Sequence, residues 1–128
     1  MQRIATKEAP EAIGPYSQAV VSGDMIFVSG QLPIQPENGF MPEGIEEQTI
    51  CALKNVQAIL QAAGSDMQDI VKVTVYMQDL SDFSTMNVCY ANYFSPPYPA
   101  RAAIQAAALP KGAKIEIDVI ARKRGCTE

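Results

Sequence analysis

The longest regular pattern of apolar positions covers residues 45–63 and has the spacing of one face of a helix. Glu46 and Glu47 fall in its first turn, where negative charge favours a helix, and Gly64 follows as a stop. A second, shorter helix is expected at about residues 83–94, with Asp82 as its N-cap. The prolines of "SPPYP" must end it, because proline cannot continue the helical hydrogen bonds.

Alternating β-branched and apolar residues predict five strands in the rest of the chain. Gly23 and Asp24 separate the first two as a hairpin turn, and "LPKG" joins the last two. The stretch of residues 31–44 is rich in Pro and Gly and indicates an irregular loop. The expected strands cover about residues 18–22, 25–29, 70–77, 101–108 and 113–122.

The order β-β-α-β-α-β-β predicts a single α+β domain over residues 1–128, with a mixed sheet and both helices on one face. Nothing else in the chain could cover the other face. We expect that face to be apolar, with Ile104, Ile115, Ile117 and Val119 contributing to it. A second copy of the chain would cover it, so the pattern predicts an oligomer.

Composition limits the chemistry. The chain has no histidine, which excludes Ser-His-Asp and Cys-His catalysis, and its three scattered cysteines (Cys51, Cys89 and Cys126) indicate inert packing in a reducing compartment. We therefore expect no metal site and no cofactor.

The net charge of −4 argues against nucleic acid as a partner, and the cluster Arg122-Lys123-Arg124 is interpreted as a solvated strand end. No apolar run suits a membrane span or a secretory signal, so a cytoplasmic location is expected.

Two charges stand out in the nearly uncharged stretch "YPARAAIQAAALPKGAKIEIDV". If "LPKG" closes a hairpin that pairs Ala108 with Ala113, then Arg101 lies opposite Ile120 and Glu116 points to the same side as Arg101. The two side chains would then be roughly 13 Å apart at the backbone, with room for a small ligand between them. The alternative is that both are ordinary surface charges.

Two further stretches have a structural and a functional interpretation. "GPYSQAV" is either a turn into a strand that packs Tyr16 or part of a ligand site. "VSGQLP" is either a strand end in which Gly30 serves backbone geometry alone or part of the same site.

Five segments in order resemble the RidA (YjgF) family of small imine deaminases: "AIGPYSQAV", "FVSGQLP", "ALKNVQAIL", "VKVTVYMQDLSDFSTMN" and "YPARAAIQAAALPKGAKIEIDVIA". The resemblance extends over nearly the whole chain. Its most specific part is P-A-R followed fifteen residues later by I-E-I.

Membership would imply a chorismate mutase-like fold, homotrimers with ligand clefts between subunits, and a small 2-imino or 2-keto acid as ligand. The implied activity is hydrolysis of 2-iminobutanoate and 2-iminopropanoate to 2-keto acids and ammonia. By resemblance, Arg101 carries the substrate carboxylate and Glu116 holds the attacking water. The remaining residues that match the family's cleft are Tyr16, Ser29, Gly30, Asn87 and Ala103.

The sequence departs from the family pattern at two points. Many relatives have Cys where this chain has Ala103, and "YFSPPYPAR" is shorter than in many of them. Two other functions stay open: a carboxylate-binding regulator without turnover, and the ribonuclease activity reported for some relatives. Glu116 favours the enzyme over the regulator, and the acidic charge argues against the ribonuclease.

Overall fold

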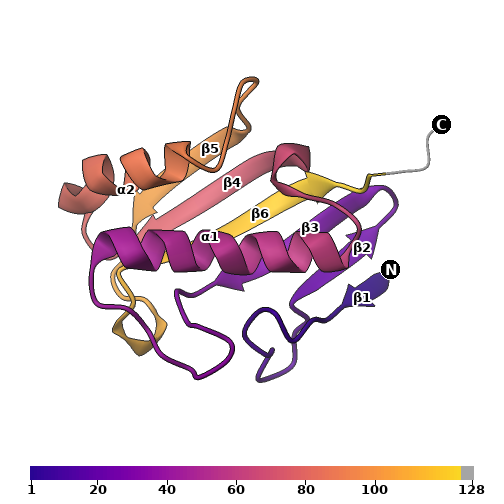
Figure 1. The fold of residues 1–128 in the computed structure, drawn as a ribbon, viewed down its shortest axis with the longest axis horizontal. Coiled ribbons are helices and arrows are strands. Elements are labelled where there is room, and N and C mark those ends of the chain that lie inside the picture. The colour runs from indigo at the N-terminus through magenta and orange to yellow at the C-terminus, as the bar shows by residue number, and fades with distance from the viewer. Residues whose placement is uncertain (125–128) are drawn as a thin grey trace.

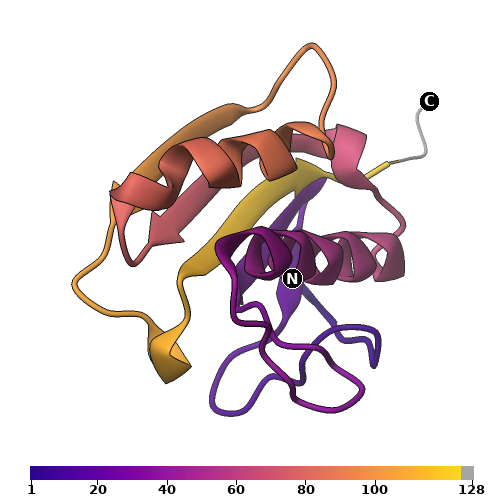
Figure 2. The ribbon, with the colours of Figure 1, turned by 60° about the vertical axis from the view of Figure 1, so that its left-hand side comes forward.

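Residues 1–124 are described by a computed structural model, in which one six-stranded sheet carries two helices on a single face (Figure 1). Helix α1 (Ile45–Ala62) and helix α2 (Phe83–Ala91) lie side by side across that face (Figure 2). This confirms the predicted α+β domain with a mixed sheet. The strands are β1 (Gln2–Ile4), β2 (Ala19–Ser22), β3 (Met25–Gln31), β4 (Ile70–Met77), β5 (Ala100–Gln105) and β6 (Ile115–Arg122).

The order of the strands across the sheet is β1-β2-β3-β6-β4-β5. Strand β5 pairs with β4 in parallel, whereas β6 lies antiparallel between β3 and β4. The predicted hairpin of the last two strands is therefore wrong, and Arg101 is not paired with Ile120. Instead, a turn at Pro110–Gly112 carries the chain past β4 into the centre of the sheet.

Burial explains why β6 is central and β5 is at the edge. Ile115, Ile117 and Val119 are at most 2% exposed beneath the helices, whereas most of the alanine-rich β5 is exposed. A strand with a fully apolar face is stabilised most between two neighbours. Our expectation that these three residues lie on the uncovered face is wrong, because alternation fixes which residues share a face but not which face it is.

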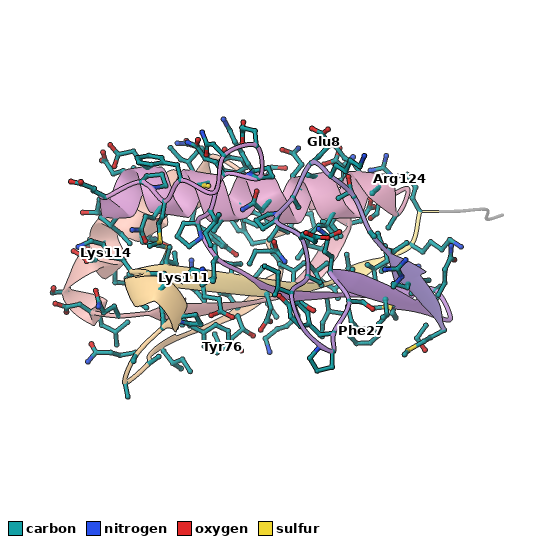
Figure 3. All side chains as sticks on the ribbon, turned by 90° about the horizontal axis from the view of Figure 1, so that it is seen from below. Glu8, Phe27, Tyr76, Lys111, Lys114 and Arg124 are labelled. Atoms are coloured by element: carbon teal, nitrogen blue, oxygen red, sulfur yellow. The ribbon has the colours of Figure 1, made fainter. Side chains whose placement is uncertain are left out.

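The face of the sheet opposite the helices is partly apolar and exposed. Figure 3 shows Phe27 and Tyr76 on the side away from α1. Phe27 is 43% exposed and Ile104 is 48% exposed, and their partners Ile120 and Tyr76 extend the same surface across β6 and β4. Exposed aromatic and aliphatic side chains on adjacent strands are typical of an interaction surface.

Three local features differ from the sequence-based expectations. Strand β1 was not predicted, and α2 ends at Ala91, earlier than expected. Asp82 occupies the N-cap position but its side chain makes no capping bond. A 3₁₀ turn (Leu80–Asp82) leads into α2 instead, and the Asp79 carboxylate accepts from the Ser81 N–H at 2.9 Å.

Two expectations from the composition concern the cysteines and a membrane span. Cys51 and Cys89 are buried, as expected for packing residues, and burial raises the pKa of both thiols. Cys126 lies outside the described residues. Within residues 1–124, neither helix has the length and apolar character needed to cross a membrane.

Candidate active site

Arg101 is held in place by helix α2. It lies near the start of β5, and its Nη1 donates a 2.6 Å hydrogen bond to Asn87 Oδ1. Its guanidinium lies 4.7 Å from the ring centroid of Tyr90 and 5.4 Å from that of Phe83. A cation over aromatic faces is attracted by the ring electrons, and a bond to Asn87 fixes its orientation. Arg101 is thus an oriented, exposed cation and not a freely moving surface charge.

Phe83 and Tyr90 were not identified from the sequence, although a signal was present. With Asn87 they are spaced four and three residues apart, so all three lie on one face of α2. The expected residue Asn87 is therefore the middle member of a row that contacts Arg101. The Tyr90 ring also stacks on the Phe94 ring, with the two ring centroids 4.4 Å apart.

Glu116 lies at an irregularity of the sheet. The pairing of β3 with β6 slips by one residue between Val28 and Gln31, which is a β-bulge. Gly30 is the residue of this bulge that faces Glu116: a Cβ atom at position 30 would collide with the Glu116 carboxylate. Gly30 therefore leaves the space that the carboxylate occupies. Its role goes beyond the backbone geometry that a strand end requires.

The surroundings of Glu116 favour its protonated form. It is half-buried, and burial together with the negative charge of Asp118 raises its pKa above the ordinary value. Asp118 in turn accepts a 2.8 Å hydrogen bond from the Tyr76 hydroxyl. A carboxyl group with a raised pKa can exchange protons closer to neutral pH than an ordinary glutamate can.

Tyr16 and Ser29 lie beside Gly30. The Ser29 hydroxyl donates a 2.6 Å hydrogen bond to the Ser17 carbonyl, which ties the segment after Tyr16 to β3. Tyr16 is 54% exposed and lines, with Gly30, a cavity of about 500 Å³. Tyr16 is therefore not a packed core residue, and its ring faces space that a ligand could enter.

Arg101 and Glu116 do not meet within one chain. Arg101 pairs with Val73, whose side chain is buried beneath the helices, so Arg101 points to the helix face. Glu116 pairs with Tyr76, which lies on the opposite face. The expectation that both point to the same side is wrong, because it depended on the incorrect hairpin.

The remaining expected residue, Ala103, belongs with Arg101. It pairs with Val75 and packs against the core on the helix face, two residues along β5. The candidate residues thus fall into two half-sites. One contains Arg101, Asn87 and Ala103 on the helix face, and the other contains Glu116 on the opposite face, with Gly30 against its carboxylate and Ser29 and Tyr16 beside Gly30.

Among residues 1–124, no group of three or more His, Cys, Asp or Glu side chains is placed to hold a metal ion. The absence of a cofactor stays a prediction.

Known proteins resemble this chain over nearly its full length. A 2-iminobutanoate/2-iminopropanoate deaminase of Bos taurus is 51% identical, covering 92% of this chain and 87% of its own. The Escherichia coli protein of the same name is 48% identical, covering 94% of this chain and 97% of its own. The crystal structure of E. coli TdcF with bound serine superposes with a TM-score of 0.93 at 44% identity, covering 97% of this chain and 100% of its own. A family model described as Endoribonuclease L-PSP matches residues 6–123. The resemblance to RidA (YjgF) proteins is confirmed, and the chain belongs to the Endoribonuclease L-PSP family.

Proposed function

We propose that this protein hydrolyses small 2-imino acids, such as 2-iminobutanoate and 2-iminopropanoate, to 2-keto acids and ammonia. Relatives at about 50% identity carry the name of this activity. One observation supports the way the site is built: the two half-sites lie on opposite faces of the sheet in each chain. The proposed active site therefore joins the Arg101 half-site of one copy to the Glu116 half-site of a neighbouring copy.

The chemistry needs an anchor and a proton acceptor. The Arg101 guanidinium binds the substrate carboxylate with two parallel hydrogen bonds, which fixes the imine carbon in place. Glu116 accepts a proton from a water molecule as the oxygen of that water bonds to the imine carbon. The electrons of the C=N double bond move to nitrogen, which takes up a proton from solvent, and a neutral carbinolamine with one hydroxyl and one amino group results.

The second half of the reaction releases ammonia. Glu116 returns its proton to the nitrogen, the C–N bond breaks, and the hydroxyl proton passes to solvent as the carbonyl forms, which balances the proton taken up in the first half. The products are the 2-keto acid and ammonia, so atoms and charges balance. The raised pKa of Glu116 suits a group that both accepts and returns a proton.

The direct test is hydrolysis of freshly generated imine. We expect this protein to accelerate ammonia release from 2-iminopropanoate and 2-iminobutanoate above the uncatalysed rate. Binding of 2-oxobutanoate without acceleration would instead identify a regulator, and cleavage of RNA without imine hydrolysis would identify a ribonuclease. The net charge of −4 supports a small ligand over RNA. A cytoplasmic location fits this role and stays a prediction.

A homotrimer is the proposed assembly, and its mass is the next prediction. The exposed surface around Phe27 and Ile104 would be covered by neighbouring copies, as an apolar face of this kind requires. Light scattering should therefore give a mass near three times 13.8 kDa. A monodisperse monomer at micromolar concentration would exclude a site shared between copies.

Gly30→Ala tests whether the bulge serves Glu116. The added methyl group must displace the Glu116 carboxylate, which is the mobile end of a side chain, so we expect a stability change below about 1 kcal/mol. Misplacement of a catalytic group by about 1 Å costs roughly 10²-fold, so kcat should fall by roughly 10- to 100-fold. Both quantities are measured by thermal unfolding and imine hydrolysis.

The chain supplies a matched control for this variant. A Cβ at Gly44 would likewise meet a glutamate carboxylate, that of Glu47, at the start of α1. Gly44→Ala should leave kcat unchanged. If Gly30→Ala also left kcat unchanged, the position of the Glu116 carboxylate would not matter for turnover.

A further inference from the structure

Lys111 has a backbone conformation that lysine rarely adopts. Its φ of 59° makes it the only non-glycine residue with positive φ among residues 1–124. Gly112 follows with a φ of 70°. In this left-handed region the Cβ of an ordinary residue is crowded, so Gly or Asn is favoured. The turn would be more stable with glycine at position 111, which suggests that the lysine side chain has another use.

Lys111 lines a cavity that also contains two residues of the Glu116 half-site, Tyr16 and Gly30. This cavity of about 500 Å³ is lined by Tyr16, Gly30 and Lys111, and Lys111 is the only cation among its described lining residues. Glu11 is the only anion among them. Figure 3 shows Lys111 on the turn that precedes β6, at the end of the sheet. Lys111 is exposed to solvent and lines this cavity.

The electrostatics of this half-site oppose an anionic ligand. Glu116, Asp118 and Glu11 are all acidic, and the chain carries a net charge of −4. A 2-imino acid carries a carboxylate, so it approaches a surface of its own sign. A cation at the mouth of the cavity lowers this repulsion and raises the local concentration of anions.

We propose that Lys111 is a specificity-determining residue that draws carboxylate substrates into the cavity beside Gly30. This role rests on the proposed function and adds to it a second cation, supplied by the copy that carries Glu116. Arg101 from the neighbouring copy then fixes the carboxylate. The turn at Pro110–Gly112 holds Lys111 in this position. Glycine at position 111 would give a more stable turn but would carry no charge.

The test is a series of side chains that changes the charge at position 111 stepwise. We measure the Kd for 2-oxobutanoate by calorimetry for wild type, Lys111→Arg, Lys111→Met and Lys111→Glu. Loss of one nearby charge should raise Kd about 5-fold, and charge reversal about 25-fold. Lys111→Arg should stay within 2-fold of wild type. These differences should shrink at about 0.5 M salt, where screening acts over only a few ångströms.

A further variant separates the charge from the fold. Lys111→Gly should raise Tm, because it relieves the left-handed strain, and should still weaken binding as Lys111→Met does. A merely structural lysine would give a changed Tm with an unchanged Kd. Lys54→Met removes an exposed lysine outside this cavity and serves as the control, with no expected change in Kd.

The outcomes distinguish this inference from the proposed function. If Kd does not follow the charge at position 111, or follows it equally at high salt, Lys111 does not attract the ligand. If Arg101→Ala abolishes binding while the Lys111 series has no effect, the proposed site stands and the role of Lys111 is excluded. If both Arg101→Ala and the Lys111 series leave binding unchanged, the ligand does not occupy this site at all.

Discussion

Glu116→Gln should reduce kcat for imine hydrolysis by roughly two to four orders of magnitude, while binding of 2-oxobutanoate is largely retained. Glutamine keeps the shape of the side chain above Gly30 but cannot accept a proton from water. The measurements are imine hydrolysis and titration calorimetry on the purified oligomer. Wild-type turnover in this variant would mean that another group activates the water.

The pH dependence gives an independent view of the same residue. The base form of Glu116 is lost as the pH falls through its raised pKa, so the acid limb of kcat/KM should lie above the ordinary range of glutamate. Asp118→Asn removes a neighbouring negative charge and should move this limb to lower pH. A limb that does not move would show that the charge of Asp118 does not affect the pKa of the Glu116 carboxyl group.

Glu116→Gln should not lower the free energy of unfolding at neutral pH, because folding raises the pKa of the Glu116 carboxyl group. A carboxyl group whose pKa is raised by folding opposes folding when it is ionised. This penalty is absent below the pKa of the unfolded chain, grows as the pH rises from that value to the raised pKa of the folded chain, and is constant above it. The neutral glutamine avoids that penalty, so unfolding is not the expected cause of a loss of activity in this variant, and thermal unfolding checks this.

Arg101→Lys should lower kcat/KM by at least about 10-fold, and Arg101→Ala should abolish measurable binding of 2-oxobutanoate. Lysine keeps the charge but loses the planar fork that binds a carboxylate at two points. It also forfeits the guanidinium geometry that faces Asn87, Tyr90 and Phe83. Loose binding of the substrate then misplaces the imine carbon relative to the water.

The controls for Arg101 concern assembly and position. Each variant is first checked by light scattering, because Arg101 lies on the exposed edge strand β5. Arg122→Lys makes the same chemical change at an exposed arginine near the end of β6 and should have no effect on activity. Unchanged affinity and rate in both Arg101 variants would exclude it as the carboxylate anchor.

Local patterns predicted the elements of this fold well, and the pairing between them poorly. The helix at residues 45–63 and the strand at 70–77 follow from side-chain periodicity, which is a local property. The position of β6 between β3 and β4 depends on contacts between distant parts of the chain. Nothing in "LPKG" shows whether the chain returns beside β5 or crosses to the far side of β4.

The candidate site residues come from the resemblance and stay a prediction, whereas their predicted geometry is wrong. The spacing between Arg101 and Glu116 suggested one face of one hairpin. The structure separates them by a whole strand and turns them to opposite faces. Tyr90 and Phe83 were missed because an aromatic residue on a helix is usually a packing residue, and only the contact with Arg101 distinguishes these two.

The bulge in β3 makes the strand less regular and leaves room for the Glu116 side chain. Buried positions fall at Ile26 and Val28, and the next is Gln31, so the two-residue rhythm is broken by one extra residue at the place where Glu116 needs room. Removing that residue would restore a regular ladder of hydrogen bonds and close the space over Gly30. A strand with perfect alternation would thus be the better strand and the poorer site, and selection for stability alone would be expected to erase this irregularity.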